Sequence, residues 1–409
     1  MRTRPVPSLA LLAAATAIGF SALHIVVPAL PLLARVFDAR PADVQLVVTL
    51  YLAGIGVGQL VYGPVSDRFG RRPVLLVGLV MFLAGTLLCG LAWSLPVLIA
   101  GRVLEACGAC AGTVLGRAII RDVYDRESAA RGLALVMMAM TLAPAISPAF
   151  GAYLAEWVDW RAIFALLGLL GALVLALIWL RLGETNRNPT RLDLVGMGRS
   201  YASLLGSRPY LAFALCSACS SGSWFTFTSS APYLLSEQMH RPPSTYGLMI
   251  LLPMATYVLG NAVAARFAIR LGSNLLFAIG LWISLASGVL MVVWCLVDPT
   301  PWALFMPMAI SGIGNGISQP SAVASALSVQ PRIAGAASGL TGFLQMAVSS
   351  VGTYVVGMLP HDDAMPIVLV IGAFLALAVL FAIPVMRMPR DSRPAGARPL
   401  VAAKSSGAD

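Results

Sequence analysis

The stretch Gly63-Pro64-Val65-Ser66-Asp67-Arg68-Phe69-Gly70-Arg71-Arg72 joins two long apolar segments and is the most specific local signal in the chain. Its two glycines and its proline predict a tight helix–turn–helix, since both residue types interrupt regular structure. One acid, Asp67, lies among three guanidinium groups, those of Arg68, Arg71 and Arg72. A loop that only oriented the chain in a membrane would need neither Asp67 nor Gly70 at these spacings. The stretch therefore predicts a latch of opposite charges at the mouth of a helical bundle.

The composition around this stretch is that of a membrane protein. Of the 409 residues, 59% are apolar and 11% are charged, whereas about a quarter of the residues of a typical soluble domain are charged. The net charge of +10 indicates basic loops at a membrane surface, and no basic stretch interleaved with aromatic residues suggests nucleic-acid binding. The six cysteines lie within apolar runs, which argues against a secreted disulfide scaffold. We expect a polytopic membrane protein with no nucleic-acid partner.

Apolar segments long enough to span a bilayer recur along the whole chain. Each must be helical, because hydrocarbon offers no partner to unpaired backbone groups and the chain shows no barrel-like alternation. The fold class that we expect is an all-α membrane protein with twelve transmembrane helices. The expected spans are residues 9–30, 44–63, 74–93, 96–118, 132–155, 161–181, 210–235, 247–269, 273–296, 302–327, 335–359 and 365–386.

The basic residues predict the orientation of these spans. Loops on the side of the N-terminus hold 22 arginines and lysines, and loops on the opposite side hold four. By the positive-inside rule, both termini are expected in the cytoplasm, and the even number of spans agrees.

The longest connection divides the spans into two halves of six. We expect an N-terminal bundle at 1–182, a cytoplasmic linker at 183–208, a C-terminal bundle at 209–386 and a disordered cytoplasmic tail at 387–409. Apolar and basic residues within the linker are compatible with a short helix on the anionic leaflet or with a plain solvated linker.

The opening stretch resembles the signature loop of the major facilitator superfamily, which has the form Gly-x-x-x-Asp-Arg-x-Gly-Arg-Arg. Together with further motifs, the chain resembles the Bcr/CflA-type drug:proton antiporters, including the bicyclomycin and chloramphenicol/florfenicol exporters. The resemblance covers almost the whole chain and is denser in the first half. The further motifs are Pro28-Ala29-Leu30-Pro31, Gly101-Arg102-Val103-Leu104-Glu105-Ala106-Cys107-Gly108, Arg117-Ala118-Ile119-Ile120-Arg121-Asp122, Trp160-Arg161-Ala162-Ile163-Phe164, Gly183-Glu184-Thr185 and Ala334-Gly335-Ala336-Ala337-Ser338-Gly339.

This resemblance implies two pseudo-symmetric six-helix bundles that move about a site at the middle of the membrane. It further implies a monomer in the bacterial inner membrane that exports small amphipathic drugs in exchange for protons. The alternative is an exporter or importer of one specific metabolite with unknown ion coupling. An enzyme is not expected, since no His-Glu-x-x-His motif and no pair of membrane carboxylates is present. We expect no cofactor.

Pro144, Pro148 and Gly151 match the antiporter motif of the resembled family, although Ala143 and Phe150 stand where the family often has glycine. Each proline removes a backbone hydrogen bond, so a kinked span is expected here. The resemblance implies that this kink seals the cavity and favours exchange over leakage. An ordinary packing kink is the alternative.

Three ionisable residues within the spans are candidates for proton coupling: His24, Arg102 and Glu105. A charge at a helix centre costs about 2.5–3.5 kcal/mol on insertion scales, so such residues usually serve a function. The i, i+3 spacing of Arg102 and Glu105 allows them to neutralise each other. Glu105 could therefore bind a proton, attract a cationic drug or only balance Arg102. The resembled family commonly has an aspartate where this chain has His24, which could titrate or remain a neutral buried histidine.

Aromatic and amide residues of the second half are candidates for a substrate cavity, as an aromatic, sparsely polar cavity suits amphipathic drugs. Packing or interhelical hydrogen bonding is the alternative for any one of them. The spacing of Cys107 with Cys110 and of Cys216 with Cys219 could serve a soft metal, but no metal site is expected because no polar surroundings accompany these cysteines. The cavity candidates, together with Arg102, are Trp224, Phe227, Tyr257, Asn261, Asn315 and Gln319.

Overall fold

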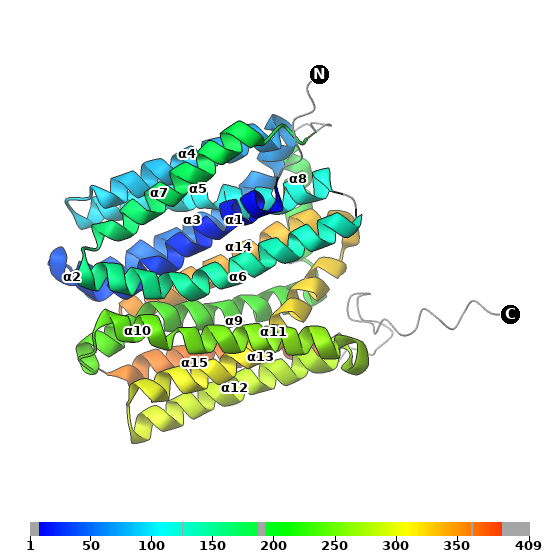
Figure 1. Cartoon of the computed structure of the whole chain (residues 1–409). Helices are drawn as coiled ribbons and strands as arrows, with labels where there is room; N and C mark the ends of the chain where they lie inside the picture. The colour runs from blue at the N-terminus through cyan, green and yellow to red at the C-terminus, as the bar shows by residue number, and fades with distance from the viewer. Residues whose placement is uncertain (1–7, 125, 187–192, 361–362, 387–409) are drawn as a thin grey trace. The chain divides into compact units, whose positions relative to one another are not determined.

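The computed structural model describes residues 8–124, 126–186, 193–360 and 363–386, and every regular element in these ranges is helical (Figure 1). The tail at 387–409 and part of the predicted linker, 187–192, lie outside the described residues. The longer helices are α1 (Leu9–Ile25), α3 (Pro41–Phe69), α4 (Arg71–Gly90), α5 (Leu95–Val123), α6 (Arg126–Trp157), α7 (Arg161–Arg181), α8 (Leu194–Leu205), α9 (Arg208–Tyr233), α11 (Leu251–Leu271), α12 (Ser273–Val297), α13 (Pro301–Ser328), α14 (Ala334–Gly357) and α15 (Ala364–Met386).

The helices supply the predicted membrane spans. Within the described ranges, ten helical segments are long and apolar enough to cross a bilayer. Helices α9 and α13, of 26 and 28 residues, are also long enough to cross, although serine and amide side chains lower their hydropathy. These two helices complete the expected set of twelve. The chain is therefore a multi-pass membrane protein with the all-α fold that the sequence predicts.

Several spans extend beyond the predicted bounds or are interrupted. After α1, the chain continues through the 3₁₀ turn η1 (Val27–Ala29) into α2 (Leu30–Val36), so the first span breaks near its proline. The short helix α10 (Pro243–Met249) precedes α11, and a π-helical turn, η2 (Leu234–Gln238), follows α9. The predicted linker contains α8, which favours the short helix over a wholly irregular connection.

The described structure divides into two compact units. Unit 1 comprises residues 1–194 with 228–248 and 353–362, and unit 2 comprises 195–227, 249–352 and 363–409. Unit 1 thus includes the last turns of α9 and α14 in addition to the first six spans. The Thr49 and Thr353 hydroxyls lie 2.9 Å apart, which ties the end of α14 to α3. The division at 1–182 and 209–386 into bundles of six stays a prediction.

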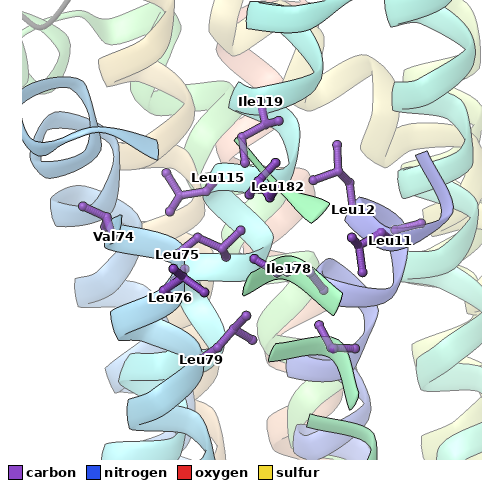
Figure 2. Close-up of a cluster of buried hydrophobic side chains, with 14 of the residues drawn as sticks. Leu11, Leu12, Val74, Leu75, Leu76, Leu79, Leu115, Ile119, Ile178 and Leu182 are labelled. Carbon is purple, nitrogen blue, oxygen red and sulfur yellow. The ribbon is translucent and has the colours of Figure 1, made fainter. Parts of the chain in front are cut away.

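The core of unit 1 is apolar and tightly packed. Leucine, isoleucine and valine side chains from α1, α4, α5 and α7 meet in one buried cluster, drawn in Figure 2. Glycines bring α4 and α5 into close contact, because a side chain at Gly78 would meet Ala111 and one at Gly108 would meet the backbone of Phe82. Such contacts between small residues are typical of packed membrane helices. They place α5, which carries the central charged residues, in close contact with α4.

Candidate functional site

Arg102 and Glu105 form a salt bridge in the interior of unit 1. Helix α5 begins at Leu95, after Ser94, and runs without a break past both residues. The i, i+3 spacing therefore places the two side chains together, as predicted, and Arg102 Nη1 lies 2.6 Å from Glu105 Oε2. Both side chains are 0% exposed. The pair neutralises two charges that would otherwise be very costly to bury.

Helices α1 and α3 hold the Arg102 guanidinium from two further directions. Arg102 Nη1 also donates to the Ala22 carbonyl of α1, at 3.0 Å. The guanidinium carbon lies 3.9 Å from the centre of the Tyr51 ring, a cation–π contact. Tyr51 is itself fixed, because its hydroxyl donates to the Gly19 carbonyl at 2.9 Å. Within the described part of the chain, Arg102 Nε and Nη2 have no hydrogen-bond partner.

The Glu105 carboxyl group faces Thr86 of α4. Thr86 Oγ1 lies 2.9 Å from Glu105 Oε1 and 2.8 Å from the Phe82 carbonyl oxygen. A hydroxyl has a single proton, so Thr86 donates to an ionised Glu105 or to Phe82, but not to both at once. When Glu105 is protonated, its own O–H donates to Thr86 Oγ1, and the Thr86 proton turns to Phe82. The same atoms therefore satisfy the hydrogen bonds of both protonation states.

A glycine sets the approach of α4 to this carboxyl group. A side chain at Gly85 would collide with the backbone of Glu105. Because Gly85 lies one residue before Thr86, the close approach allows the Thr86 hydroxyl to reach Oε1. Sequence spacing predicted the Arg102–Glu105 pair but missed Thr86 and Tyr51, which come from other helices and carry no motif.

His24, the third coupling candidate, lies in the last turn of α1 and is buried, at 4% exposure. Its Nδ1 lies 2.9 Å from the Phe20 carbonyl oxygen, which accepts a hydrogen bond in the tautomer that carries the Nδ1 proton. His24 is two residues beyond Ala22, whose carbonyl binds Arg102. All three candidates thus belong to unit 1. A coupling role for His24 stays a prediction.

The predicted latch forms a network of charges, but its backbone differs from the expected turn. Residues up to Phe69 are helical, with Pro64 inside α3, and only Gly70 lies between α3 and α4. The prediction that Gly63 and Pro64 belong to the turn is therefore wrong, because the helix tolerates both residues. Arg71 is the centre of the network, since its guanidinium bonds Asp67 at 2.5 Å and Asp122 at 2.9 Å. It also donates to Ser66 Oγ at 2.6 Å.

Glu184, which follows the end of α7, completes this network. Its carboxylate accepts hydrogen bonds from the backbone N–H groups of Arg71 and Arg72, at 2.9 and 3.2 Å. A carboxylate is favourable at this place, because the first N–H groups of a helix have no partner within the helix. Gly70 has φ +96° and ψ 151°, and a side chain there would meet the Glu184 carboxylate. Only glycine fits this junction without strain.

The remaining latch arginines make aromatic contacts. Arg72 donates to the Trp179 carbonyl at 3.0 Å and lies 5.6 Å from the centre of its ring. Arg68 lies over the Phe69 ring at 5.3 Å. Asp122 lies 51 residues from Arg71 in the sequence, and Glu184 lies 113 residues from it. Sequence spacing therefore could not predict these contacts, although both acids belong to motifs of the resembled family.

Helix α6 carries the predicted antiporter motif. The helix is continuous from Arg126 to Trp157 with Pro144 and Pro148 inside it, and the kink stays a prediction. A side chain at Gly151 would collide with the Ile25 carbonyl oxygen of α1. Gly151 therefore allows α6 to lie directly against α1 at Ile25, the residue that follows His24.

In unit 2, four of the cavity candidates form hydrogen bonds, and the Gln319 cluster joins different helices. Ser217 of α9 donates to Gln319 Oε1 at 2.6 Å, and Gln345 of α14 donates to Ser217 Oγ at 2.6 Å. Asn315 is buried and donates to Ser311 at 3.2 Å, while its Oδ1 has no hydrogen-bond partner among the described residues. The side chains of Tyr257 and Asn261 are hydrogen-bonded to each other.

The aromatic candidates of α9 pack against one another and against α13. Phe227 is 1% exposed and lies edge-on to Phe305, with ring centres 5.2 Å apart. Trp224 is half-buried, and its ring centre is 6.4 Å from that of Phe227. Phe227 therefore contributes to packing within unit 2. A substrate-binding role for these residues stays a prediction.

For the cysteine pairs, the structure gives no support for a metal. Over residues 8–124, 126–186, 193–360 and 363–386, no three histidine, cysteine or acidic side chains lie close enough together to hold an ion. The six cysteines are free thiols.

The sequence and the fold both match a known transporter family. Residues 9–211 and 213–406 match the Major Facilitator Superfamily. The chain belongs to the Major Facilitator Superfamily. The superfamily consists of transporters, so the arrangement above is to be interpreted as that of a transporter.

Two bacterial relatives narrow the place of the chain within the superfamily. It is 33% identical over 393 residues to a chloramphenicol resistance protein of Pseudomonas aeruginosa, covering 93% of this chain and 90% of the relative. It is 31% identical over 400 residues to multidrug resistance protein D of Escherichia coli, covering 96% and 99%. These matches confirm the resemblance to the Bcr/CflA-type members of the superfamily.

A solved structure supports the fold. The crystal structure of the peptide transporter POT in complex with sulfate superposes with a TM-score of 0.76 at 14% identity. The superposition covers 92% of this chain and 94% of the transporter. At this identity the likeness concerns the major facilitator fold alone.

Proposed function

We propose that this major facilitator exports small amphipathic drugs, phenicol-like antimicrobials among them, in exchange for protons by alternating access. The observation that carries the proposal is the buried Arg102–Glu105 pair with Thr86 beside it. A buried ion pair adds little net stability compared with apolar residues of the same volume. By contrast, a carboxyl group whose hydrogen bonds are satisfied in both protonation states can bind and release a proton without leaving a buried polar atom unpaired.

Proton binding at Glu105 changes the charge of the interior of unit 1. While Glu105 is ionised, it cancels the charge of Arg102. Once Glu105 is protonated, the Arg102 guanidinium is uncompensated, since arginine does not lose its proton in proteins. A buried net charge is costly, so protonation favours a conformation in which Arg102 meets water or a polar ligand. Proton binding at Glu105 would thus shift the conformational equilibrium of the transporter, which couples proton transfer to alternating access.

The two units differ in the ionisable groups that they bury. Among the described residues, the fully buried arginine and carboxylate and the buried histidine all belong to unit 1, whereas the buried polar residues of unit 2 are serines, threonines and Asn315. We assign proton coupling to unit 1 for this reason, with Glu105 as the carrier and His24 as the other candidate. The polar clusters of unit 2 would contribute to drug binding.

The latch would control access from the cytoplasmic side. Its network joins the α3–α4 junction to α5 through Asp122 and to α7 through Glu184. Such a network has to rearrange if these helices move during transport. The arginine distribution supports a cytoplasmic location for the latch and for both termini, in the inner membrane of a bacterium. A monomer is sufficient, because one chain supplies both halves of the fold.

Drug uptake into proteoliposomes driven by an imposed pH gradient tests this function. The wild-type protein is expected to accumulate radiolabelled chloramphenicol only when the gradient is present. Glu105→Gln should lose this gradient-driven uptake and retain drug exchange across the membrane without a gradient, because glutamine mimics a permanently protonated carboxyl group. His24→Gln is the comparison variant. Loss of coupling in His24→Gln alone would make His24 the carrier.

The drug panel also tests the alternative function. Chloramphenicol is used first because of the name of one relative, and further antimicrobials of different shape follow. A folded wild-type protein that transports no member of the panel would contradict drug export and favour a transporter of one specific metabolite.

A further inference from the structure

The connection between the two halves forms a small basic pocket within unit 2, away from the Arg102–Glu105 pair. Helix α8 and the segment between α13 and α14 surround a cavity of about 460 Å³. The 3₁₀ turn η3 (Pro331–Ile333) contributes the second side of the cavity. The lining residues are Arg199, Ser200, Ser203, Gln330, Pro331, Arg332 and Ile333.

The charge of this pocket favours an anion. Two of the lining residues are arginines and none is acidic. Neither Arg199 nor Arg332 forms an ion pair with any residue that the structure describes. Two guanidinium groups that line one small cavity, from α8 and from η3, can both bind a phosphate, because each offers several N–H donors in one plane.

The polar residues of the pocket add a donor and hold its two sides together. Ser203 of α8 donates to Gln330 Oε1 at 3.2 Å, which fixes α8 to the α13–α14 segment. Because Oε1 accepts this bond, the remaining polar atom of Gln330 is its amide nitrogen, which is a donor. Ser200 donates to the Gly196 carbonyl at 2.9 Å. The pocket therefore presents N–H donors to a ligand.

The apolar surroundings distinguish a lipid from a free anion. Pro331 and Ile333 form an apolar wall of the same cavity. On α8, Val195 and Leu205 are 67% and 47% exposed, while Leu204 is fully buried. An amphipathic helix with exposed apolar and basic residues is typical of a segment that lies at the membrane surface. A free phosphate would use the guanidinium groups but not the apolar wall.

We propose that this pocket binds the phosphate of an anionic phospholipid of the cytoplasmic leaflet. Arg199 and Arg332 hold the phosphate, and Pro331 and Ile333 contact the glycerol and the first methylene groups. The lipid links α8 to the α13–α14 segment and so anchors the connection between the two halves at the membrane surface. The proposal depends on the predicted cytoplasmic location of residues 183–208 and does not depend on drug export.

Native mass spectrometry of the full chain with phosphatidylglycerol tests the proposal. The double variant Arg199→Gln/Arg332→Gln is expected to retain this lipid about tenfold less than the wild type, since each arginine near a membrane surface contributes a substantial share of the attraction. The matched control is Arg266→Gln/Arg270→Gln, which removes two arginines of α11 outside the pocket and should retain the lipid as the wild type does. Phosphatidylcholine should be lost equally from all three proteins.

Two further arms keep the test decisive. Arg199→Lys/Arg332→Lys preserves both charges without the planar donors and should retain more of the lipid than the glutamine variant, which separates lost charge from misfolding. Millimolar inorganic phosphate should not displace the lipid. Equal retention of phosphatidylglycerol by the two glutamine variants would overturn the proposal. Displacement by inorganic phosphate would overturn the lipid assignment in favour of a site for free anions.

Discussion

At the scale of residues, the central feature is a charged pair that the fold buries completely. Sequence spacing was sufficient to predict that Arg102 and Glu105 meet, because both lie on one unbroken helix. It could not predict Thr86, Tyr51 or the Ala22 carbonyl, because these groups reach the pair from α4, α3 and α1. Such contacts depend on how helices pack, and a single sequence has no pattern that encodes them.

The pair makes a clear prediction for stability. Glu105→Met leaves a buried guanidinium that cannot lose its proton, so it should destabilise the protein by about 3–5 kcal/mol. Arg102→Met/Glu105→Met removes both charges and should be markedly more stable than Glu105→Met alone. Thermal unfolding of the detergent-purified proteins measures the difference. A double variant no more stable than Glu105→Met would contradict the view that charge compensation dominates at this site.

At the scale of elements, the helix junctions depend on single glycines whose roles differ. The sequence predicted the latch motif correctly as a cluster of charges but placed both of its glycines in a turn. In the structure, Gly63 is helical, whereas Gly70 has a positive φ and forms the junction. Helix α3 continues past Pro64, although proline has no N–H to donate within the helix. Local residue preferences could not show which glycine ends the helix.

These two glycines form a matched pair for mutagenesis. Gly70→Ala should cost about 1–3 kcal/mol, because its backbone conformation is nearly restricted to glycine and its side chain would meet Glu184. Gly63→Ala should be neutral or stabilising by up to about 1 kcal/mol, because the residue is helical with open space around it. Thermal unfolding of both variants checks this order. Equal losses at the two positions would show that the junction is not where the structure places it.

The contact between α6 and α1 makes the same kind of prediction. Gly151→Ala should push α6 away from α1, since the new methyl group would collide with the Ile25 carbonyl oxygen. We expect a loss of about 1–3 kcal/mol in stability, as for other overpacked sites, together with weaker drug transport. Phe150→Ala is the control, because Phe150 is 58% exposed. If Gly151→Ala unfolded at the wild-type temperature, the direct α1–α6 contact would be wrong.

At the scale of the whole molecule, composition and loop charges were enough to predict the fold class. Twelve apolar segments and a strong arginine bias leave few alternatives to a polytopic helical protein. The distribution of function between the units was harder to predict, because candidate residues were spread over both halves of the sequence. Among the described residues, the buried charged side chains belong to unit 1, whereas the buried polar residues of unit 2 are uncharged serines, threonines and Asn315. The two units therefore carry different chemistry.

The most direct test of proton exchange is drug-triggered proton movement in everted membrane vesicles, followed with an internal pH dye. Chloramphenicol added outside vesicles with an acidic interior should raise the internal pH in the wild type, because each drug molecule that enters is exchanged for protons that leave. Glu105→Gln should abolish this change while the protein remains folded. Drug accumulation without proton movement, or an unchanged proton signal in Glu105→Gln, would contradict the assignment of Glu105 as the proton carrier.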